Sequence, residues 1–375
     1  MGTRPEAIKM APVVRELKRF PRRFDTRVIA TAQHRRLADE VLALFAIEPD
    51  HDLDVMTSRQ SLTRVTCRVL SRLEPVLAEL RPDLVLVQGD AATAFAGALA
   101  AYYQSVPVGH VEAGLRTHDK YDPYPEEIFR RLVTGIADLH FAPTSAARAA
   151  LVGEGVPERR IHVTGNTVID ALLSVAEQAH PLPARVRRAL ASGERRLVLV
   201  TAHRRENWGR PLRQICEALR ALARAFEDIV IVYALHPNPE VTEVARAALG
   251  SEPRVVLIQA PPYAPFVSLM QRSYVVLTDS GGLQEEAPAL AKPVLVLRRT
   301  TERPEGIAAG VAELVGVEKP AIVSAATRLL SDQRAYRRMA RAANPYGDGK
   351  AASRIRKAIL NYFGLGPRPR DFAAR

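Results

Sequence analysis

Cysteine is scarce in this chain of 375 residues: only Cys67 and Cys216 occur, each within a stretch of helical periodicity. Two isolated cysteines argue against a disulfide framework and against a cysteine-based metal site. Long apolar runs are missing as well, since none reaches the roughly 18 residues that a membrane-spanning helix needs. The first residues carry no charged and then apolar signal pattern. We therefore expect a cytoplasmic protein without a membrane partner.

Aromatic residues are few, at 6% of the chain, whereas the net charge is +12, from 53 basic and 41 acidic residues. Such an excess of positive charge can attract either nucleic acid or a small polyanion. The arginines are spread along helical stretches and form no dense run with interleaved aromatics. The composition thus favours a solvated, arginine-rich surface to which local phosphate-binding sites contribute, and no nucleic-acid partner.

Short apolar runs rich in β-branched residues recur between segments of helical period, a pattern typical of strands alternating with helices. In the first half the expected strands span residues 27–31, 84–88, 107–111, 139–142 and 161–163. In the second half they span residues 197–201, 229–235, 255–258, 274–278, 293–297 and 312–315. Helical segments lie between them, for example at 60–80 and 210–226. This alternation predicts an α/β fold with parallel sheets and helices on both faces.

Two prolines, Pro181 and Pro183, interrupt the pattern near the middle of the chain, so residues 178–187 are the expected linker. We predict one Rossmann-like domain over residues 1–177 and a second over 186–350. A last helix within 351–375 is expected to return to the first domain. In two doubly wound domains that face a cleft, ligands bind where the carboxyl ends of the strands open into it.

The sequence GTRPEAIK at residues 2–9 opens a predicted helix. Pro5 suits the first helical turn, and Gly2 lets the backbone approach a ligand closely. Arg4 and Lys9 bring positive charge to the helix N-terminus, a combination that favours an anion. An ordinary capped surface helix would have the same pattern, so this motif alone leaves both interpretations open.

A glycine turn, DSGGLQEE at residues 279–286, follows the strand that ends at 278. Gly281 and Gly282, preceded by Ser280, expose backbone N–H groups that can cradle a phosphate. Glu286 lies one turn further along the helix and can accept hydrogen bonds from a ribose diol. Glycine turns are common, so this motif alone again supports a structural role equally well.

Acidic residues follow two strands of the first half at the place where parallel sheets carry catalytic groups. Asp90 comes after the strand 84–88, and Glu112 directly follows the strand 107–111. Glu126 and Glu127 begin a helix after the loop 116–125. Carboxylates that converge in this way supply an acid and a base for proton transfer at carbon. Helix capping is the alternative role for the pair of glutamates.

Basic residues follow strands of the second half in a similar way. His203, in TAHRREN at residues 201–207, is flanked by two arginines at a strand end, which favours phosphate binding over a structural role. Arg303, in TTERPEG at 300–306, follows another strand end and faces the same site. His236 is similarly placed and is a weaker candidate.

Taken together, these stretches resemble the non-hydrolysing UDP-N-acetylglucosamine 2-epimerase family. The resemblance rests on residues 2–13 (GTRPEAIKMAPV), 31–35 (TAQHR), 109–117 (GHVEAGLRT), 124–127 (YPEE), 164–172 (TGNTVIDAL), 201–207 (TAHRREN), 279–288 (DSGGLQEEAP) and 300–306 (TTERPEG). The resemblance implies a GT-B-like architecture and interconversion of UDP-GlcNAc and UDP-ManNAc in a homodimer. It implies no redox cofactor and no metal, and the motif G-x-G-x-x-G is absent after every expected strand.

The same resemblance assigns roles by position. Asp90, Glu112 and Glu126 resemble the catalytic acids, and His203 joins the catalytic set as a contact of the leaving group. The expected substrate contacts are Arg4, Lys9, Arg130, His203, Ser280, Gly281, Gly282, Glu286 and Arg303. The implied reaction removes the C2 proton while UDP leaves C1, and re-addition returns a proton to the other face of C2.

The chain departs from the family pattern in four places. The family has a short strand before the GTRPE loop, so we expect the natural chain to begin some 6–10 residues upstream, roughly one strand length. Arg36 stands where members with an allosteric second substrate site carry glutamine, although Gln33, His34, Arg68 and His236 stay candidates for such a site. Arg299 and Ala91 replace an aspartate and a threonine without removing an assigned group.

Three other functions remain open. The chain could epimerise a related UDP-sugar, or hydrolyse UDP-GlcNAc to ManNAc and UDP. It could also be a UDP-sugar glycosyltransferase of the same architecture. A glycosyltransferase would explain the glycine turn but not three acids beside the GTRPEAIK motif.

Overall fold

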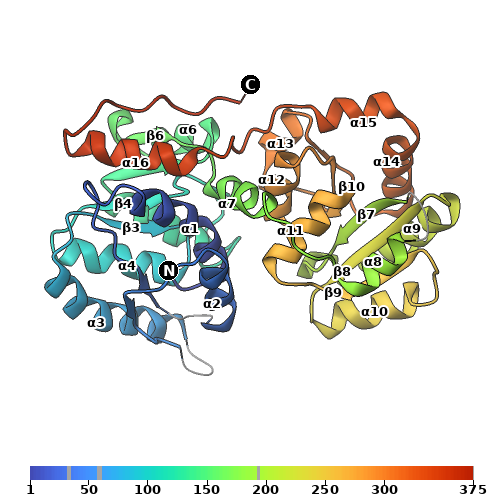
Figure 1. The fold of residues 1–375 in the computed structure, drawn as a ribbon, viewed down its shortest axis with the longest axis horizontal. Coiled ribbons are helices and arrows are strands. Elements are labelled where there is room, and N and C mark those ends of the chain that lie inside the picture. The colour runs from blue at the N-terminus through green and yellow to red at the C-terminus, as the bar shows by residue number, and fades with distance from the viewer. Residues whose placement is uncertain (32–34, 57–60, 192–194, 375) are drawn as a thin grey trace. The chain divides into compact units, whose positions relative to one another are not determined.

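The computed structural model describes residues 1–31, 35–56, 61–191 and 195–374, with two compact units. Unit 1 consists of Met1–Ala171 and Tyr346–Ala373, and unit 2 consists mainly of Leu172–Pro345 (Figure 1). Up to Ala373 the chain therefore leaves unit 1 once and returns to it once.

Unit 1 is built on a parallel four-stranded sheet in the order β3-β4-β5-β6, where sequential strands are neighbours. The strands are β3 (Val85–Gln88), β4 (Val108–Val111), β5 (Leu139–Ala142) and β6 (Ile161–Val163). The helices α4 (Ala92–Tyr103), α5 (Glu126–Ile136) and α6 (Ser145–Gly153) connect them in turn. This alternation of strand and helix is the βαβ arrangement that the sequence pattern predicts.

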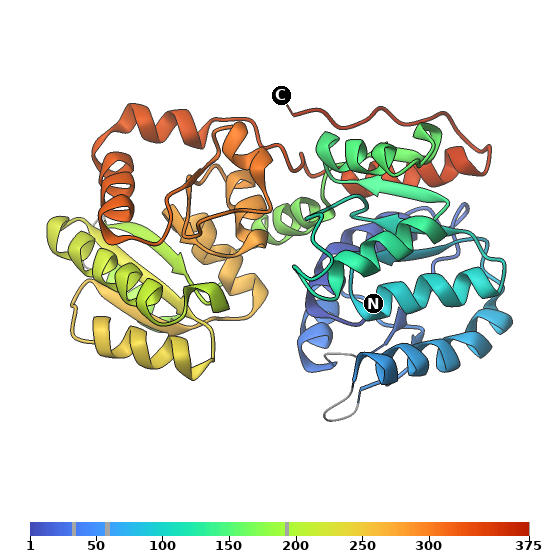
Figure 2. The ribbon, with the colours of Figure 1, turned by 180° about the vertical axis from the view of Figure 1, so that it is seen from behind.

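Helices cover both faces of this sheet. On one face α1 (Arg4–Lys18) lies beside α16 (Ala351–Tyr362), and both pack on Val111, Leu139 and Phe141 (Figure 1). On the other face lie α3 (Leu62–Leu80), α4 and α5 (Figure 2). The buried residues of α3 are spaced four apart, the spacing that brings one stripe of a helix to a core; they are Val65, Val69, Leu73 and Leu77.

The start of α1 is fixed by a capping box. The Thr3 hydroxyl accepts the Glu6 N–H at 3.4 Å, and the Glu6 carboxylate accepts the Thr3 N–H at 2.7 Å. Glu6 also accepts the Thr93 hydroxyl at 3.2 Å and so joins α1 to α4. The expected proline stands in the first turn, as Pro5. These contacts orient the GTRPEAIK segment on the sheet.

A separate two-stranded parallel sheet, β1 (Ile29–Ala30) with β2 (His51–Asp52), completes unit 1 together with α2 (Arg35–Leu44). Met1 pairs with the free side of β1, because its ammonium donates to the Ile29 carbonyl at 2.9 Å and its carbonyl accepts the Thr31 N–H at 2.9 Å. A cavity of about 720 Å³ adjoins Met1, and its lining combines apolar side chains of β1, β3, α1 and α3 with polar ones that include Glu6, Gln88 and Thr93. A strand upstream of Gly2 stays a prediction.

Unit 2 holds a six-stranded parallel sheet in the order β12-β11-β10-β7-β8-β9. Its strands are β7 (Arg196–Thr201), β8 (Ile229–Leu235), β9 (Val255–Gln259), β10 (Ser273–Thr278), β11 (Val294–Val296) and β12 (Ala312–Leu314). The chain order runs outward in both directions from β7 and β10. These two central strands therefore form the topological switch point, where Rossmann-like sheets bind ligands.

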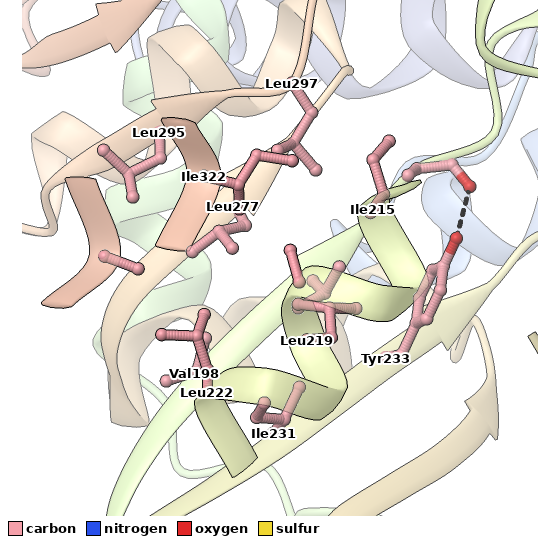
Figure 3. Close-up of a cluster of buried hydrophobic side chains, with 14 of the residues drawn as sticks. Val198, Ile215, Leu219, Leu222, Ile231, Tyr233, Leu277, Leu295, Leu297 and Ile322 are labelled. Atoms are coloured by element: carbon pink, nitrogen blue, oxygen red, sulfur yellow. Dashed lines mark hydrogen bonds between the residues drawn. The ribbon is translucent and has the colours of Figure 1, made fainter. Parts of the chain in front are cut away.

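Helices also cover both faces of the unit 2 sheet. One face of the sheet is covered by α9 (Arg210–Ala225), α10 (Pro239–Leu249) and α14 (Lys319–Ser331). The strands are contacted from the opposite face by α8 (Ala184–Leu190), α11 (Tyr263–Arg272) and α12 (Gly281–Ala289). The remaining helices are α7 (Thr167–Ala176), α13 (Pro304–Ala308) and α15 (Gln333–Ala340). In the core, Ile215, Leu219 and Leu222 of α9 pack over Val198 and Ile231 (Figure 3).

The core of unit 2 includes a buried polar contact near the carboxyl end of β7. Tyr233 of β8 is fully buried, and its hydroxyl donates to the Ala202 carbonyl at 2.8 Å (Figure 3). Burial also raises the pKa of Tyr233 well above its usual value. The hydrogen bond satisfies a hydroxyl that would otherwise be costly to bury, and it fixes the backbone that leads from β7 to His203.

The fold class predicted from the sequence, α/β with parallel sheets, is confirmed, and every expected strand is present with only its ends shifted. The short strand β2 was not expected, since a two-residue strand leaves no periodicity to detect. The linker expected over 178–187 stays a prediction, and the structure adds that α8 begins within this segment at Ala184. Pro183 stands directly before that helix, where proline is compatible with a helix start rather than with an unstructured linker.

Candidate functional site

The acids expected in unit 1 lie at the carboxyl edge of its sheet. Gln88, the last residue of β3, pairs in register with Val111, the last residue of β4. Asp90 and Glu112 follow these two ends, so they leave neighbouring strands at the same edge. His110, on β4, binds the turn that precedes Asp90, because its Nε2 donates to the Gly89 carbonyl at 2.8 Å.

Glu112 is the most tightly held of these acids. The Lys9 ammonium lies 2.5 Å from its Oε1 and 2.7 Å from its Oε2. The Gln88 amide donates to Oε2, and the Asn166 amide donates to Oε1 at 3.2 Å. Glu112 itself is buried and has a φ of 66°, a left-handed backbone that costs a residue with a side chain about 1–3 kcal/mol. Such strain persists only where surrounding contacts impose it, as the three donors do here.

Asp90 is bound to α5 through Arg130. The guanidinium of Arg130 lies 2.6 Å and 2.8 Å from Asp90 Oδ2 and 3.4 Å from Glu127. Glu127 is fully buried and accepts the N–H groups of Thr117 and His118, at 3.1 and 3.3 Å. Glu127 is thus an anchor for the loop that precedes α5, and these hydrogen bonds go to that loop rather than to the first N–H groups of the helix.

Glu126 begins α5, as the sequence predicts. It is half-buried, and its Oε2 is buried without a hydrogen-bond partner in the part of the chain that the structure describes. Arg130 lies one turn further along α5 and reaches Asp90, so the start of this helix is close to the end of β3. The structure therefore brings the regions of all three expected acids to one edge of unit 1.

In unit 2 the organising residue is Asp279, which follows the central strand β10. It is fully buried and accepts the backbone N–H groups of His203 and Arg204, each at 2.8 Å, and the Asn207 amide at 3.0 Å. These three donors come from the segment that follows β7. Asp279 therefore ties together the two loops at the switch point of the sheet.

His203 lies in this junction beside a second histidine. Its Nδ1 is 3.6 Å from Asp279 Oδ1, and its ring stacks on the ring of His236 with centroids 5.4 Å apart. Burial lowers the pKa of His203, while the nearby carboxylate of Asp279 acts in the opposite direction. The pair of stacked imidazoles thus joins the ends of β7 and β8 at the site.

The glycine turn opens α12 at the same edge. The helix begins at Gly281, and the Ser280 side chain makes no capping hydrogen bond to it. The guanidinium groups of Arg204 and Arg303 flank Gly281, lying 3.8 and 3.9 Å from the point where a Cβ would stand. A helix N-terminus with two arginines beside it is suited to an anion such as a phosphate. Arg303 is held in place by an ion pair with the buried Glu285.

Glu286, the expected ribose contact, lies on the same helix. It is largely buried, and the Tyr263 hydroxyl donates to it at 2.9 Å. Its Oε2 is 3.6 Å from the Cβ position of Gly282, so the carboxylate and the glycine turn are adjacent. At the other end of the chain, Arg4 begins α1 in unit 1 and is only partly buried.

The residues proposed for an allosteric site are divided between the units. Arg68 is on α3 in unit 1 and donates to the Val55 carbonyl at 3.3 Å, whereas His236 stacks on His203 in unit 2. Gln33 and His34 lie outside the described residues, as does the side chain of Arg36. This site stays a prediction.

Several site residues had no role in the sequence prediction. They are Gln88, Asn166, Arg204, Asn207, Tyr263, Asp279 and Glu285. Asp279 had a usable signal, because it follows a strand end in the same way as Asp90. Asn166 lies in the TGNTVIDAL stretch, but its partner Glu112 is 54 positions away in the sequence, and no local pattern reports such a contact.

Among the described residues, no group of three or more histidine, cysteine or acidic side chains is arranged to hold a metal ion. Within the same residues, no helix combines the length and apolar character that crossing a membrane requires.

Comparison with known proteins agrees with this geometry. A model of the UDP-N-acetylglucosamine 2-epimerase family matches residues 15–360. The UDP-N-acetylglucosamine 2-epimerase of Escherichia coli strain K12 is 52% identical over 366 residues, which cover 96% of this chain and 97% of the relative.

Solved structures are similar over the same extent. The UDP-GlcNAc 2-epimerase from Neisseria meningitidis, bound to UDP-GlcNAc, is 45% identical with a TM-score of 0.85 over 96% of this chain and 98% of its own. The enzyme from Methanocaldococcus jannaschii, in complex with UDP-GlcNAc and UDP, is 33% identical with a TM-score of 0.77 over the same shares. The chain has the GT-B-like fold of two Rossmann-like domains and belongs to the UDP-N-acetylglucosamine 2-epimerase family.

Proposed function

We propose that the chain interconverts UDP-GlcNAc and UDP-ManNAc by inverting C2, without net hydrolysis. The observation that carries this proposal is the buried Glu112, held against Lys9 at a strand end beside Asp90. A carboxylate fixed in this way suits proton transfer at carbon. The relatives solved with UDP-GlcNAc and with UDP support the substrate class.

The reaction begins with removal of the C2 proton by a carboxylate. The electron pair of the C–H bond forms the C1=C2 double bond, and the C1–O electron pair leaves with UDP. The products are 2-acetamidoglucal, UDP and a protonated carboxyl group. In the second step a carboxyl group returns a proton to the other face of C2, and a UDP oxygen bonds to C1. Atoms and charge balance without a hydride or an oxidant.

We assign the first proton transfer to Glu112. The adjacent Lys9 ammonium favours the ionised form of a carboxylate, which is the form that accepts a proton. Glu126 is assigned as the donor in the second step, because its Oε2 is buried without a hydrogen-bond partner among the described residues. Asp90, bound by Arg130, contributes a fixed negative charge beside them.

Unit 2 is assigned to UDP. The N-terminus of α12 and the guanidinium groups of Arg204 and Arg303 face the same point, where they can stabilise the charge that develops on the departing diphosphate. His203 joins them from the end of β7, and Glu286 takes the ribose hydroxyls. Arg4 and Lys9 are the further diphosphate contacts that the family resemblance implies. A cytoplasmic homodimer is part of the same proposal.

The proposal is tested by incubating the protein with UDP-GlcNAc and separating the products by anion-exchange chromatography. We expect a stable mixture of UDP-GlcNAc and UDP-ManNAc with no accumulation of free UDP. Stoichiometric ManNAc and UDP would instead identify a hydrolysing enzyme. Conversion of a di-N-acetylated UDP-uronic acid, with UDP-GlcNAc left unchanged, would identify a different sugar substrate.

A further inference from the structure

The two points where the chain leaves and re-enters unit 1 are held together beside Glu112. The chain leaves within α7, since unit 1 ends at Ala171, and returns at Tyr346. The Asn166 N–H donates to the Tyr346 carbonyl at 2.7 Å. Gly165 has a φ of 82°, and a Cβ there would lie 3.2 Å from the Gly347 Cα. The exit and return segments therefore meet backbone to backbone, at a separation that is tight even for a methyl group.

Asn166 is the residue that joins this junction to the acid. Its side chain is buried, and its Oδ1 accepts the Val168 N–H at 3.1 Å, which caps the start of α7. Its Nδ2 donates to Glu112 Oε1 at 3.2 Å. Both ends of the amide are used, and the two partners determine which end carries the NH₂ group. The asparagine amide thus accepts at its oxygen and donates at its nitrogen, a combination that neither serine nor aspartate provides with an NH₂ group.

A second contact fixes the return segment downstream of Tyr346. The Asp170 carboxylate, also on α7, accepts the N–H groups of Ala351 and Ala352 at 3.1 and 2.9 Å, at the start of α16. The first turn of α7 thus binds the return segment at two places. Any rotation of α7 at the exit from unit 1 would move the Asn166 amide, and with it the donor to Glu112.

We propose that Asn166 is a positioning residue that orients the Glu112 carboxylate and couples it to both connections between the units. The inference rests on the proposed epimerase function. Lys9 approaches both carboxylate oxygens and leaves the rotation of the carboxylate loosely defined, because an ammonium has no preferred plane. Asn166 donates to Oε1 from the α7 side, while Gln88 donates to Oε2 from β3. Together they define the plane of the carboxylate.

A substitution series separates this role from helix capping. Serine and aspartate at position 166 retain a side-chain oxygen that can cap α7, but neither offers an NH₂ donor to Glu112. Alanine removes both functions. As a control, Asp332→Ala removes an equivalent cap from α15 in unit 2, where Asp332 accepts the N–H groups of Arg334 and Ala335 at 2.7 and 3.1 Å.

We expect Asn166→Ser and Asn166→Asp to lower kcat by roughly 10–100-fold, as misplacement of a catalytic group does. Asn166→Asp should be the slower of the two, because it places a second carboxylate beside Glu112. Asn166→Ser should keep a wild-type melting temperature, whereas Asn166→Asp should melt lower because two carboxylates then share one buried site. Both variants should keep wild-type UDP affinity by calorimetry. Asn166→Ala should show the same kcat loss and also melt about 2–4 °C lower, whereas Asp332→Ala should lose only melting temperature.

A capping role alone predicts a different result, with Asn166→Ser as active as the wild type and Asn166→Ala impaired. That result would overturn the positioning role, as would a kcat loss that is matched by an equal loss of UDP affinity. The wild-type assay with UDP-GlcNAc distinguishes failure of the proposed function from failure of the inference about Asn166. If the wild type does not epimerise this sugar, the proposed function fails, whereas an active wild type with an active Asn166→Ser variant removes only the inference about Asn166.

Discussion

The ion pair between Lys9 and Glu112 should dominate the stability of the unit 1 edge. The Lys9 side chain is 19% exposed and that of Glu112 is 5% exposed, so the pair is mostly shielded from water. Removing one partner of a buried pair costs about 3–5 kcal/mol, because the other charge stays buried. In Lys9→Met the amides of Gln88 and Asn166 still donate to Glu112, so we expect the lower end, about 3 kcal/mol.

Urea unfolding followed by circular dichroism measures this loss. With a slope of about 1–3 kcal/mol/M, the midpoint should fall by roughly 1–3 M. The single tryptophan, Trp208, lies in unit 2, so its fluorescence is an internal control that should move less. The double variant Lys9→Met/Glu112→Gln removes both charges and should recover most of the loss. If the stability losses of Lys9→Met and Glu112→Gln sum to the loss of the double variant within about 0.5 kcal/mol, the coupling between the two residues is refuted.

Three further predictions concern binding, pH and packing. His203→Ala should weaken UDP binding by roughly 1.5–3 kcal/mol, whereas Glu112→Gln should keep UDP affinity and lose at least ~100-fold in turnover; equal losses of affinity in calorimetry would contradict this division. The melting temperature should fall as the pH is lowered from about 6.5 towards 4, because three histidines are buried in neutral form, namely His110, His140 and His162; a constant melting temperature over that range would disprove it. A short apolar strand fused before Met1 should raise the melting temperature by filling the cavity beside β1, and the same strand with a central proline should not, because proline cannot pair along its length.

The sign of the pH effect follows from burial. Burial lowers the pKa of His110 and His162 to about 4 and that of His140 to about 3, below the ordinary value of 6.5. Between these values the unfolded chain binds protons that the folded chain does not, so stability is lost as the pH falls. Asp170 acts in the opposite direction below pH 6, since burial raises its pKa to about 6. The three histidines together change the free energy of unfolding more than Asp170 does, so the protein is expected to lose stability in acid.

The sequence predicted well what local pattern determines. The strands β8 and β10 are continuous apolar runs buried on both faces, and such runs are recognisable without a structure. Asp90 and Glu112 could be found because strand ends carry function in parallel sheets. Thr3 and Glu6 form a capping box at the fixed spacing that defines this motif.

The remaining features depend on contacts between distant segments. The bond from Asn166 to Glu112 and the anchoring of His203 by Asp279 each join residues more than fifty positions apart. Arg130 was expected at the substrate, but whether its guanidinium would meet Asp90 depends on how α5 packs on the sheet. Local propensity carries no information on such pairings, since they form only when the helices and strands are assembled.

The most direct test of the central claim is the fate of the C2 proton. The reaction should be run with UDP-GlcNAc in D₂O and the products examined by NMR and mass spectrometry. Carboxyl protons exchange with water much faster than a typical turnover of ~10 per second, so UDP-ManNAc should carry deuterium at C2. Glu112→Gln should slow deuterium incorporation and epimerisation together. Epimerised product that retains protium at C2 would contradict elimination and re-addition, and with it the role of the carboxylates at the edge of unit 1.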